Sequence, residues 1–245
     1  MPSCSAFSSM PRRFRLPDSL GRLQTLAQGP ESFVRSGSGH GVLLLGTGPD
    51  PDAAAALCGD AEVIRVDCPA FVRAMRECAP GWEARIPARW RTVAPDEAVA
   101  EARSRRILLY RQNLRLFPEF WGPLWGRIQA ALLRPAAEPA AVPSVVLPVG
   151  EGHLLDRELR AAFAASGCAV REIPTRDPAA LPALLRRERP GLFFSVNLRG
   201  LDAEGAAFHL LRGCGVPVAV WFVDNPWHVL SSLRLPWWRE AALFC

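Results

Sequence analysis

The sequence contains no lysine, so its 29 basic side chains other than histidine are all arginines, and its net charge is +5. The absence of lysine excludes phosphate-loop lysines, Schiff-base lysines and lysine general bases from any mechanism. The seven cysteines are an odd number and include no C-x-x-C pair. The spacing of Cys58, Cys68 and Cys78, ten residues each, matches no zinc-ligand pattern. We therefore expect no metal site and no cofactor.

Long apolar runs are also missing. No run approaches the roughly 18 residues that a membrane-spanning helix needs, and residues 1–15 lack the apolar stretch of a signal peptide. We therefore expect a cytoplasmic protein without a membrane span. Nucleic acid is not expected as a partner, because the arginines are scattered, with only a modest cluster in residues 103–115.

Composition divides the 245 residues into four segments. Residues 1–38 are rich in Ser, Pro, Arg and Gly, and are expected to be mobile apart from a short helix at Pro17–Leu26. Residues 39–134 are expected to form an α/β subdomain. Residues 135–143, rich in Ala, Pro and Glu, are expected to be a linker. Residues 144–245 are expected to form a Rossmann-like subdomain that is incomplete at its end.

Short apolar runs alternate with helical patterns along most of the chain. This alternation predicts an α/β fold with Rossmann-like, doubly wound parallel sheets. The last run, Ala241–Cys245, has no helix after it, which suggests a truncated reading frame. The other predicted strands are Val42–Leu45, Glu62–Asp67, Ile107–Tyr110, Val145–Val149, Ala169–Ile173, Leu192–Val196 and Val216–Val223.

The two predicted strands that precede this last run, Leu192–Val196 and Val216–Val223, carry the clearest candidate site. They flank a helical segment at Asp202–Arg212, and together they predict a β-α-β unit. Ligands of open α/β sheets bind beyond the carboxyl ends of the strands. The polar residues expected at these two ends are Asn197, Asp224 and Asn225.

Glycine-containing turns follow two other predicted strands. Gly46-Thr47-Gly48 resembles the start of a nucleotide-binding turn, but the G-x-G-x-x-G fingerprint is incomplete, so a plain turn is an equal alternative. Asp67, after the next strand, either binds ribose hydroxyls or caps the following helix, and capping is favoured. In Gly150-Glu151-Gly152-His153, the glycines allow a ligand to approach the backbone.

A helical apolar pattern spans Phe117–Leu132, with Pro118 suited to a first turn and Pro123 expected to kink the helix or to begin it. The favoured interpretation is a helix packed on a sheet. The alternative is a docking face for a partner, which predicts that Trp121 and Trp125 are exposed.

Two segments, Phe193–Asp202 and Gly215–Pro226, resemble bacterial glycosyltransferases of the CgeB-like (spore-maturation) group. The second segment, with its Gly-apolar-Pro and Trp-apolar-apolar-Asp-x-Pro pattern, is the most specific part. Tyr110–Asn113 and Leu116–Gly122 also resemble a stretch found upstream in some members. The resemblance covers roughly residues 105–245.

This resemblance implies a GT-B architecture of two Rossmann-like domains with the substrates in the cleft between them. In such enzymes the amino-terminal domain mostly binds the acceptor and the carboxyl-terminal domain mostly binds the nucleotide sugar. The chain resembles the amino-terminal half and is expected to be truncated at the carboxyl terminus. The implied partners are a nucleotide sugar and a glycan or protein acceptor, and the implied reaction is sugar transfer to an acceptor hydroxyl.

Sugar transfer needs a base for the acceptor hydroxyl and groups that stabilise the leaving diphosphate. Asp224, Glu151 and His153 are the candidate bases, because each is expected at the carboxyl end of a strand. Alternatively, Asp224-Asn225-Pro226 is only a turn and helix cap. The residues expected to bind substrate are Gly150, Gly152, Asn197, Asn225, His228, Gly46 and Gly48.

Two rival functions remain open. The first is a nucleotide- or S-adenosylmethionine-binding Rossmann protein that uses Gly46-Thr47-Gly48 and Asp67, although a methyltransferase would normally have a third glycine. The second is a non-catalytic, truncated module that binds a partner through the Phe117–Leu132 face.

Overall fold

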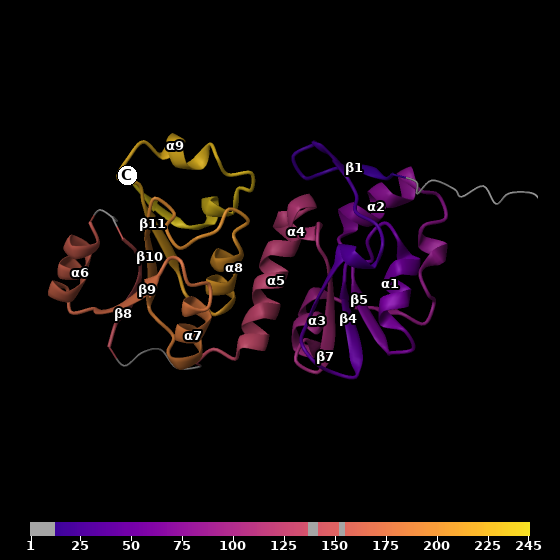
Figure 1. Cartoon of the computed structure of the whole chain (residues 1–245), viewed down its shortest axis with the longest axis horizontal. Coiled ribbons are helices and arrows are strands. Elements are labelled where there is room, and N and C mark those ends of the chain that lie inside the picture. Colours follow the sequence, from indigo (N-terminus) through magenta and orange to yellow (C-terminus); the bar gives the residue numbers. More distant parts are fainter. Residues whose placement is uncertain (1–12, 137–141, 152–154) are drawn as a thin grey trace, which may run out of the picture.

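The structure is a computed structural model that describes residues 13–136, 142–151 and 155–245. Two α/β units, each built on a five-stranded sheet, lie side by side with helix α5 (Pro118–Leu133) between them (Figure 1). Every strand pair in the second sheet is parallel, and the first sheet is parallel except at one edge. The prediction of an α/β fold with parallel sheets is therefore confirmed.

The first sheet has the strand order β3-β7-β4-β5-β6. Among its four parallel strands, β4 comes first in the chain, and β5 and β6 are added in turn on one side of it. The last parallel strand, β7, lies on the other side of β4, so the strand order reverses between β4 and β7. Helices α1 (Pro51–Cys58) and α2 (Pro69–Cys78) cover one face, and α3 (Pro95–Glu101) lies on the other (Figure 1). The strands are β3 Phe33–Ser36, β4 Gly41–Leu45, β5 Val63–Val66, β6 Arg91–Thr92 and β7 Arg105–Tyr110.

The amino-terminal segment differs from its expectation. Instead of a helix at Pro17–Leu26, β1 (Arg15–Pro17) and β2 (Leu23–Thr25) form an antiparallel hairpin, and β3 pairs antiparallel with β7. The helix prediction is wrong because the Asp18 carboxylate accepts the backbone N–H groups of Leu20 and Arg22 and so closes a turn. Described residues of the segment expected to be mobile thus form strands of the first unit.

The second sheet has the order β9-β8-β10-β11-β12, so its strands lie in the spatial order two, one, three, four, five. The helices α6 (Asp156–Ala165), α7 (Ala180–Arg187) and α8 (Ala206–Gly213) connect its strands. Figure 1 shows α6 on one face, with α7 and α8 on the other. The strands are β8 Ser144–Val149, β9 Ala169–Pro174, β10 Leu192–Val196, β11 Val218–Trp221 and β12 Ala242–Phe244.

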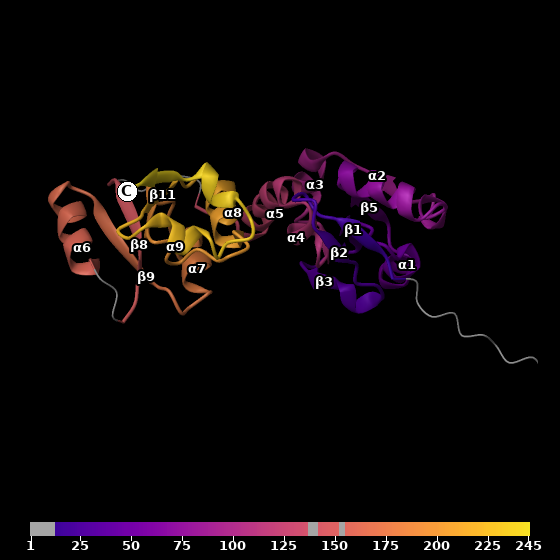
Figure 2. The ribbon, with the colours of Figure 1, turned by 90° about the horizontal axis from the view of Figure 1, so that it is seen from above.

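Helix α5 packs between α8 of the second unit and α3 of the first (Figures 1 and 2). It begins at Pro118 and continues through Pro123 without ending there. Trp121 is 1% exposed and Trp125 is partly buried against the first core. The favoured interpretation of this segment as a packed helix is confirmed, and the prediction of an exposed Trp121 is wrong, because α8 and the first unit cover the helix.

The remaining elements are the short helices α4 (Asn113–Leu116) and α9 (Pro226–Leu230), and 3-10 turns at Pro30–Ser32, Glu83–Arg85 and Trp237–Glu240. Each unit buries its own core, with Val42–Leu45 central to the first and Phe193 and Phe208 to the second. Among the described residues, no helix is both long and apolar enough to cross a membrane.

Candidate functional site

The second sheet reverses its strand order between β8 and β10. The chain leaves β8 toward β9 on one side and later leaves β10 toward β11 on the other. The connections after these two strands therefore leave in opposite directions, and ligands of such sheets bind at this edge, beyond the carboxyl ends of the strands. Gly150 and Glu151 follow β8, and Asn197 follows β10.

Asn197 and Asp224 are brought together at this edge. The amide Nδ2 of Asn197 donates to Oδ2 of Asp224 at 3.0 Å, and its Oδ1 accepts the backbone N–H of Val223 at 3.2 Å. The backbone N–H of Asn197 also donates to the carbonyl oxygen of Trp221, one step beyond the β10–β11 ladder. These three bonds fix the amide and, through it, the position of one carboxylate oxygen.

The Asp224 side chain is exposed, and no described residue donates to its other oxygen. A carboxylate with one oxygen held and the other open to solvent can accept a hydrogen bond, or a proton, from a ligand hydroxyl. The expectation that the two strand ends place an amide and a carboxylate together therefore agrees with the geometry.

The loop after β10 has an unusual backbone. Asn197 and Leu198 have φ of 49° and 64°, and Leu198 is buried. Asparagine tolerates this left-handed region, but leucine does so at a cost of about 1–2 kcal/mol. Such strain persists only where surrounding structure enforces it, and it is concentrated at functional sites.

Two contacts hold this loop. Ser195 Oγ, in a fully buried side chain, donates to the carbonyl oxygen of Arg199 at 2.8 Å. The guanidinium of Arg199 pairs with Asp156, at the start of α6, at 3.0 Å, with both side chains less than one-fifth exposed. The ion pair joins the β10 loop to the helix that follows β8, so the two sides of the switch point are linked.

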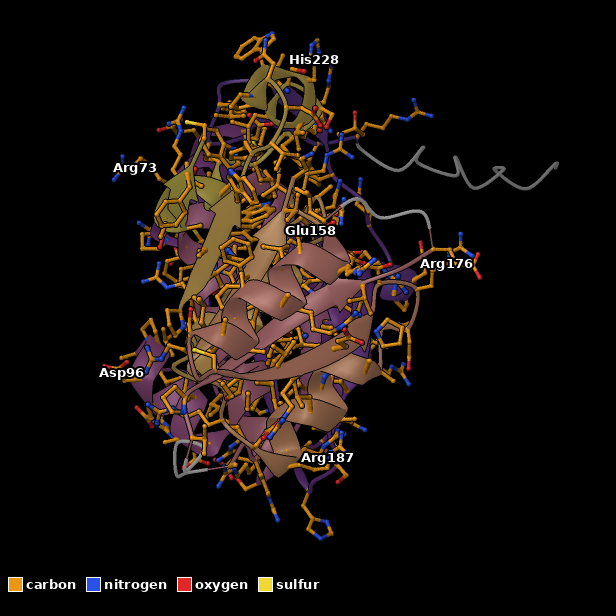
Figure 3. The ribbon with its side chains drawn as sticks, turned by 90° about the vertical axis from the view of Figure 1, so that its left-hand side faces the viewer. Arg73, Asp96, Glu158, Arg176, Arg187 and His228 are labelled. Carbon is orange, nitrogen blue, oxygen red and sulfur yellow. The ribbon has the colours of Figure 1, made fainter. Side chains whose placement is uncertain are left out.

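The other predicted site residues are placed less decisively. Asn225 caps α9, since its Oδ1 accepts the backbone N–H of Trp227 at 3.0 Å, as the turn-and-cap alternative predicts. His228 lies on α9 and points outward (Figure 3). Gly150 and Glu151 are exposed beyond β8. Gly152 and His153 lie outside the described residues.

The Gly46-Thr47-Gly48 turn is filled by the protein's own side chains. A Cβ atom at Gly46 would lie 2.5 Å from the Asn113 amide nitrogen, and one at Gly48 would lie 3.0 Å from the Tyr110 ring. The Asn113 amide donates to the carbonyl oxygen of Leu45 at 2.8 Å. Both glycines, with φ of 80° and 69°, are thus explained by close packing and backbone conformation without a ligand.

Asp67 is also occupied. Its carboxylate accepts the backbone N–H and the hydroxyl of Thr47 at 2.7 and 3.1 Å, and it pairs with Arg65. Thr47 is fully buried and the Asp67 side chain is 5% exposed. Asp67 therefore neither caps the next helix, which has no side-chain cap bond, nor presents a free oxygen to a ribose.

Sequence reasoning missed a cavity of about 450 Å³ on the α7–α8 face of the second sheet. It lies beside the carboxyl end of β9 and the loop that leads into α8. Two carboxylates line it, but Asp202 accepts the N–H groups of Ala206 and Ala207, and Asp177 accepts that of Ala179. Both carboxylates are thus engaged by backbone N–H groups at the turns that lead into α7 and α8, although neither aspartate is the N-cap residue of its helix.

Among the described residues, no three His, Cys, Asp or Glu side chains form a group that could hold a metal ion. Comparison with known proteins gives no further assignment: no family model matches the chain, and neither a curated protein nor a solved structure is significantly similar to it.

Proposed function

We propose that the chain is the acceptor-side part of a GT-B glycosyltransferase of the CgeB-like kind, which transfers a sugar from a nucleotide sugar to an acceptor hydroxyl. The observation that supports the proposal is the Asn197–Asp224 pair at the carboxyl edge of the second sheet. Both residues belong to the two segments that resemble this group.

The chemistry assigned to the pair is simple. The open oxygen of Asp224 accepts the proton of the acceptor hydroxyl as the hydroxyl oxygen bonds to the anomeric carbon of the sugar, and the bond from that carbon to the nucleoside diphosphate breaks, so that the diphosphate leaves. Asn197 holds the carboxylate and keeps it oriented, because its amide is fixed on both sides. Exposed Trp227, three residues from Asp224, adds a flat apolar surface against which a sugar ring can stack.

The rival nucleotide- or S-adenosylmethionine-binding function is not favoured. It needs an open glycine turn and a free carboxylate at Asp67, and both are engaged within the first unit. The rival partner-binding function is not favoured either, because α8 and the first unit cover α5.

A thermal melt of the purified chain with nucleotide sugars, oligosaccharides and S-adenosylmethionine tests the proposal. A ligand at 100 times its Kd stabilises the native state by about 2.7 kcal/mol, which raises the melting midpoint of a chain this size by roughly 5–10 °C. We expect a sugar ligand to give this rise, and Asp224→Asn to remove most of it.

Glu204→Gln is the matched control, since it removes one exposed carboxylate near α8 that has no bond in the described structure. A rise with S-adenosylmethionine alone would overturn the proposal in favour of the rival cofactor-binding function. If the sugar raised the melting midpoint of Asp224→Asn as much as that of the wild type, the sugar would bind at a site other than the carboxyl edge of the second sheet.

A further inference from the structure

A second cavity, of about 460 Å³, lies in the first unit between α2, the ends of β5 and β6, and the turn at Glu83–Arg85. Its volume falls within the range of small-molecule sites. It is remote from Asn197 and Asp224, which lie on the other sheet, and it does not depend on the proposed sugar transfer.

Three arginines and two carboxylates line this cavity. Asp67 is satisfied from inside by Thr47 and is paired with Arg65, whose side chain is 16% exposed. Arg65 and Asp67 are thus part of the folded framework of the wall. The charges of Arg65 and Asp67 cancel, so the net charge of the cavity lining is set by the remaining three charged side chains.

Those three are Arg73, Arg76 and Glu83. Arg76 and Glu83 form a two-bond ion pair, with both N···O distances 2.8 Å, and their side chains are 60% and 51% exposed. A pair this exposed contributes at most about 1 kcal/mol, so a ligand can open it at little cost.

Arg73 has no hydrogen-bond or ion-pair partner among the residues that the structure describes. Its side chain extends from the outline of the molecule (Figure 3). Arg73 and Arg76 follow one another on α2 at a spacing of one helical turn, so their guanidinium groups lie on the same side of the helix. The cavity therefore has one unpaired cation at its rim and a second that is weakly held.

We propose that this cavity binds a small molecule through an oxyanion group, a phosphate or a carboxylate, held by Arg73 and Arg76. Guanidinium groups suit this role because their forked N–H groups bind two oxygens at once. Trp82 and Ile86 supply an apolar wall for the body of the ligand. The wall is rigid, since the Trp82 indole N–H donates to the carbonyl oxygen of Gly48 at 2.9 Å.

Calorimetric titration of the whole chain tests the proposal with inorganic phosphate, glucose 1-phosphate, glucuronate and neutral glucose. We expect glucose 1-phosphate or glucuronate to bind, and glucose not to bind. Tighter binding of glucose 1-phosphate would indicate a phosphate site, and tighter binding of glucuronate would indicate a carboxylate site. Binding should weaken as salt is added, because the attraction is between charges that water and ions screen.

Substitution of the arginines and substitution of Glu83 should change the affinity for the anion in opposite directions. Arg73→Gln and Arg76→Gln should each weaken binding about tenfold, the effect of losing one charge-assisted contact. Glu83→Gln should strengthen binding severalfold, because it releases Arg76 from its partner and removes a negative charge. A purely structural Arg76–Glu83 pair would give no gain on the loss of Glu83.

Arg85→Gln is the matched control: Arg85 is an exposed arginine that pairs with Asp50 and Asp52 and does not line the cavity. All four changed residues are exposed, so the variants are expected to fold, which their melting midpoints will check. The proposal is overturned if none of the anions binds with a Kd below about 10 mM. It is also overturned if Arg73→Gln binds as the wild type does, or if Glu83→Gln weakens binding.

Discussion

Gly126 of α5 lies directly against the backbone carbonyl group of His209 on α8. A Cβ atom added at Gly126 would lie 2.5 Å from the carbonyl carbon of His209, and one added at Gly213 would lie 2.5 Å from the carbonyl oxygen of Gly126. Gly122, one turn earlier on α5, faces the His209 imidazole. The two units are thus joined by helices whose backbones meet without side chains between them, an approach that only glycine permits.

Replacement of Gly126 by alanine should therefore push α5 and α8 apart. We expect Gly126→Ala to lower the free energy of unfolding by about 1–3 kcal/mol, the usual cost of an added group in a packed interface. Urea denaturation measures this cost. Arg127→Ala, at the next position, should change stability by less than about 0.5 kcal/mol, because its pair with Asp96 is exposed. Equal effects of the two substitutions would contradict the close helix pair.

The Asn197–Asp224 pair predicts an asymmetry between its two members. Asn197→Ala should cost about 1–3 kcal/mol of stability, because it leaves the N–H of Val223 without its acceptor and places alanine at φ 49°. Asp224→Asn should change stability by less than about 0.5 kcal/mol, because the side chain is exposed. Thermal melts without ligand separate the two effects. A large loss in Asp224→Asn would mean that the carboxylate serves the fold.

Much of the fold could be predicted from apolar runs. Leu192–Val196 is a strand with the bounds expected, and the parallel order follows from the alternation of strands and helices. The apolar pattern does not reveal the hairpin at residues 15–25, because its turn depends on the contacts of one carboxylate, Asp18. Strand β6 was missed because it has only two residues, and both are exposed.

The candidate site was predictable where it depends on topology alone. Asn197 and Asp224 follow adjacent parallel strands, so their proximity follows from the strand order. The packing of Asn113 against the Gly46 turn was not predictable from the sequence. Asn113 lies 68 residues after Leu45, the residue whose carbonyl oxygen it hydrogen-bonds. The role of His209 at the helix junction depends likewise on the packing of two helices from different units.

Asp67 should be among the residues most important for the stability of the first unit. Its carboxylate binds Thr47 twice and pairs with the largely buried Arg65. Asp67→Ala should therefore cost about 3–5 kcal/mol, since it leaves a mostly buried guanidinium without its partner. Urea denaturation will measure this loss, with Asp60→Ala as the control at an exposed carboxylate. A small effect at Asp67 would show that water replaces the carboxylate, and would reopen this position to a ligand.

The pH dependence of stability provides a test of the helix junction. Burial lowers the pKa of His209 from its ordinary value of 6.5, against the opposing effect of Glu240 and Asp202 and with the help of Arg212. The unfolded chain therefore binds the proton at a higher pH than the folded protein does. Stability from this residue is present above about pH 6.5 and is lost as the pH falls below it, by at most about 1.4 kcal/mol per pH unit.

We expect the melting midpoint of the wild type to fall more between about pH 7.5 and pH 5.5 than that of His209→Gln, which has no imidazole to protonate. His40→Gln, which removes an exposed histidine, should keep the wild-type dependence. The comparison depends on the difference between variants, because carboxylates also titrate at the acid end and are common to all three proteins. If His209→Gln lost stability with acid as the wild type does, the imidazole would have to be hydrated in the folded state. The contact of α5 with α8 at Gly122 would then be looser than the packing of their backbones indicates.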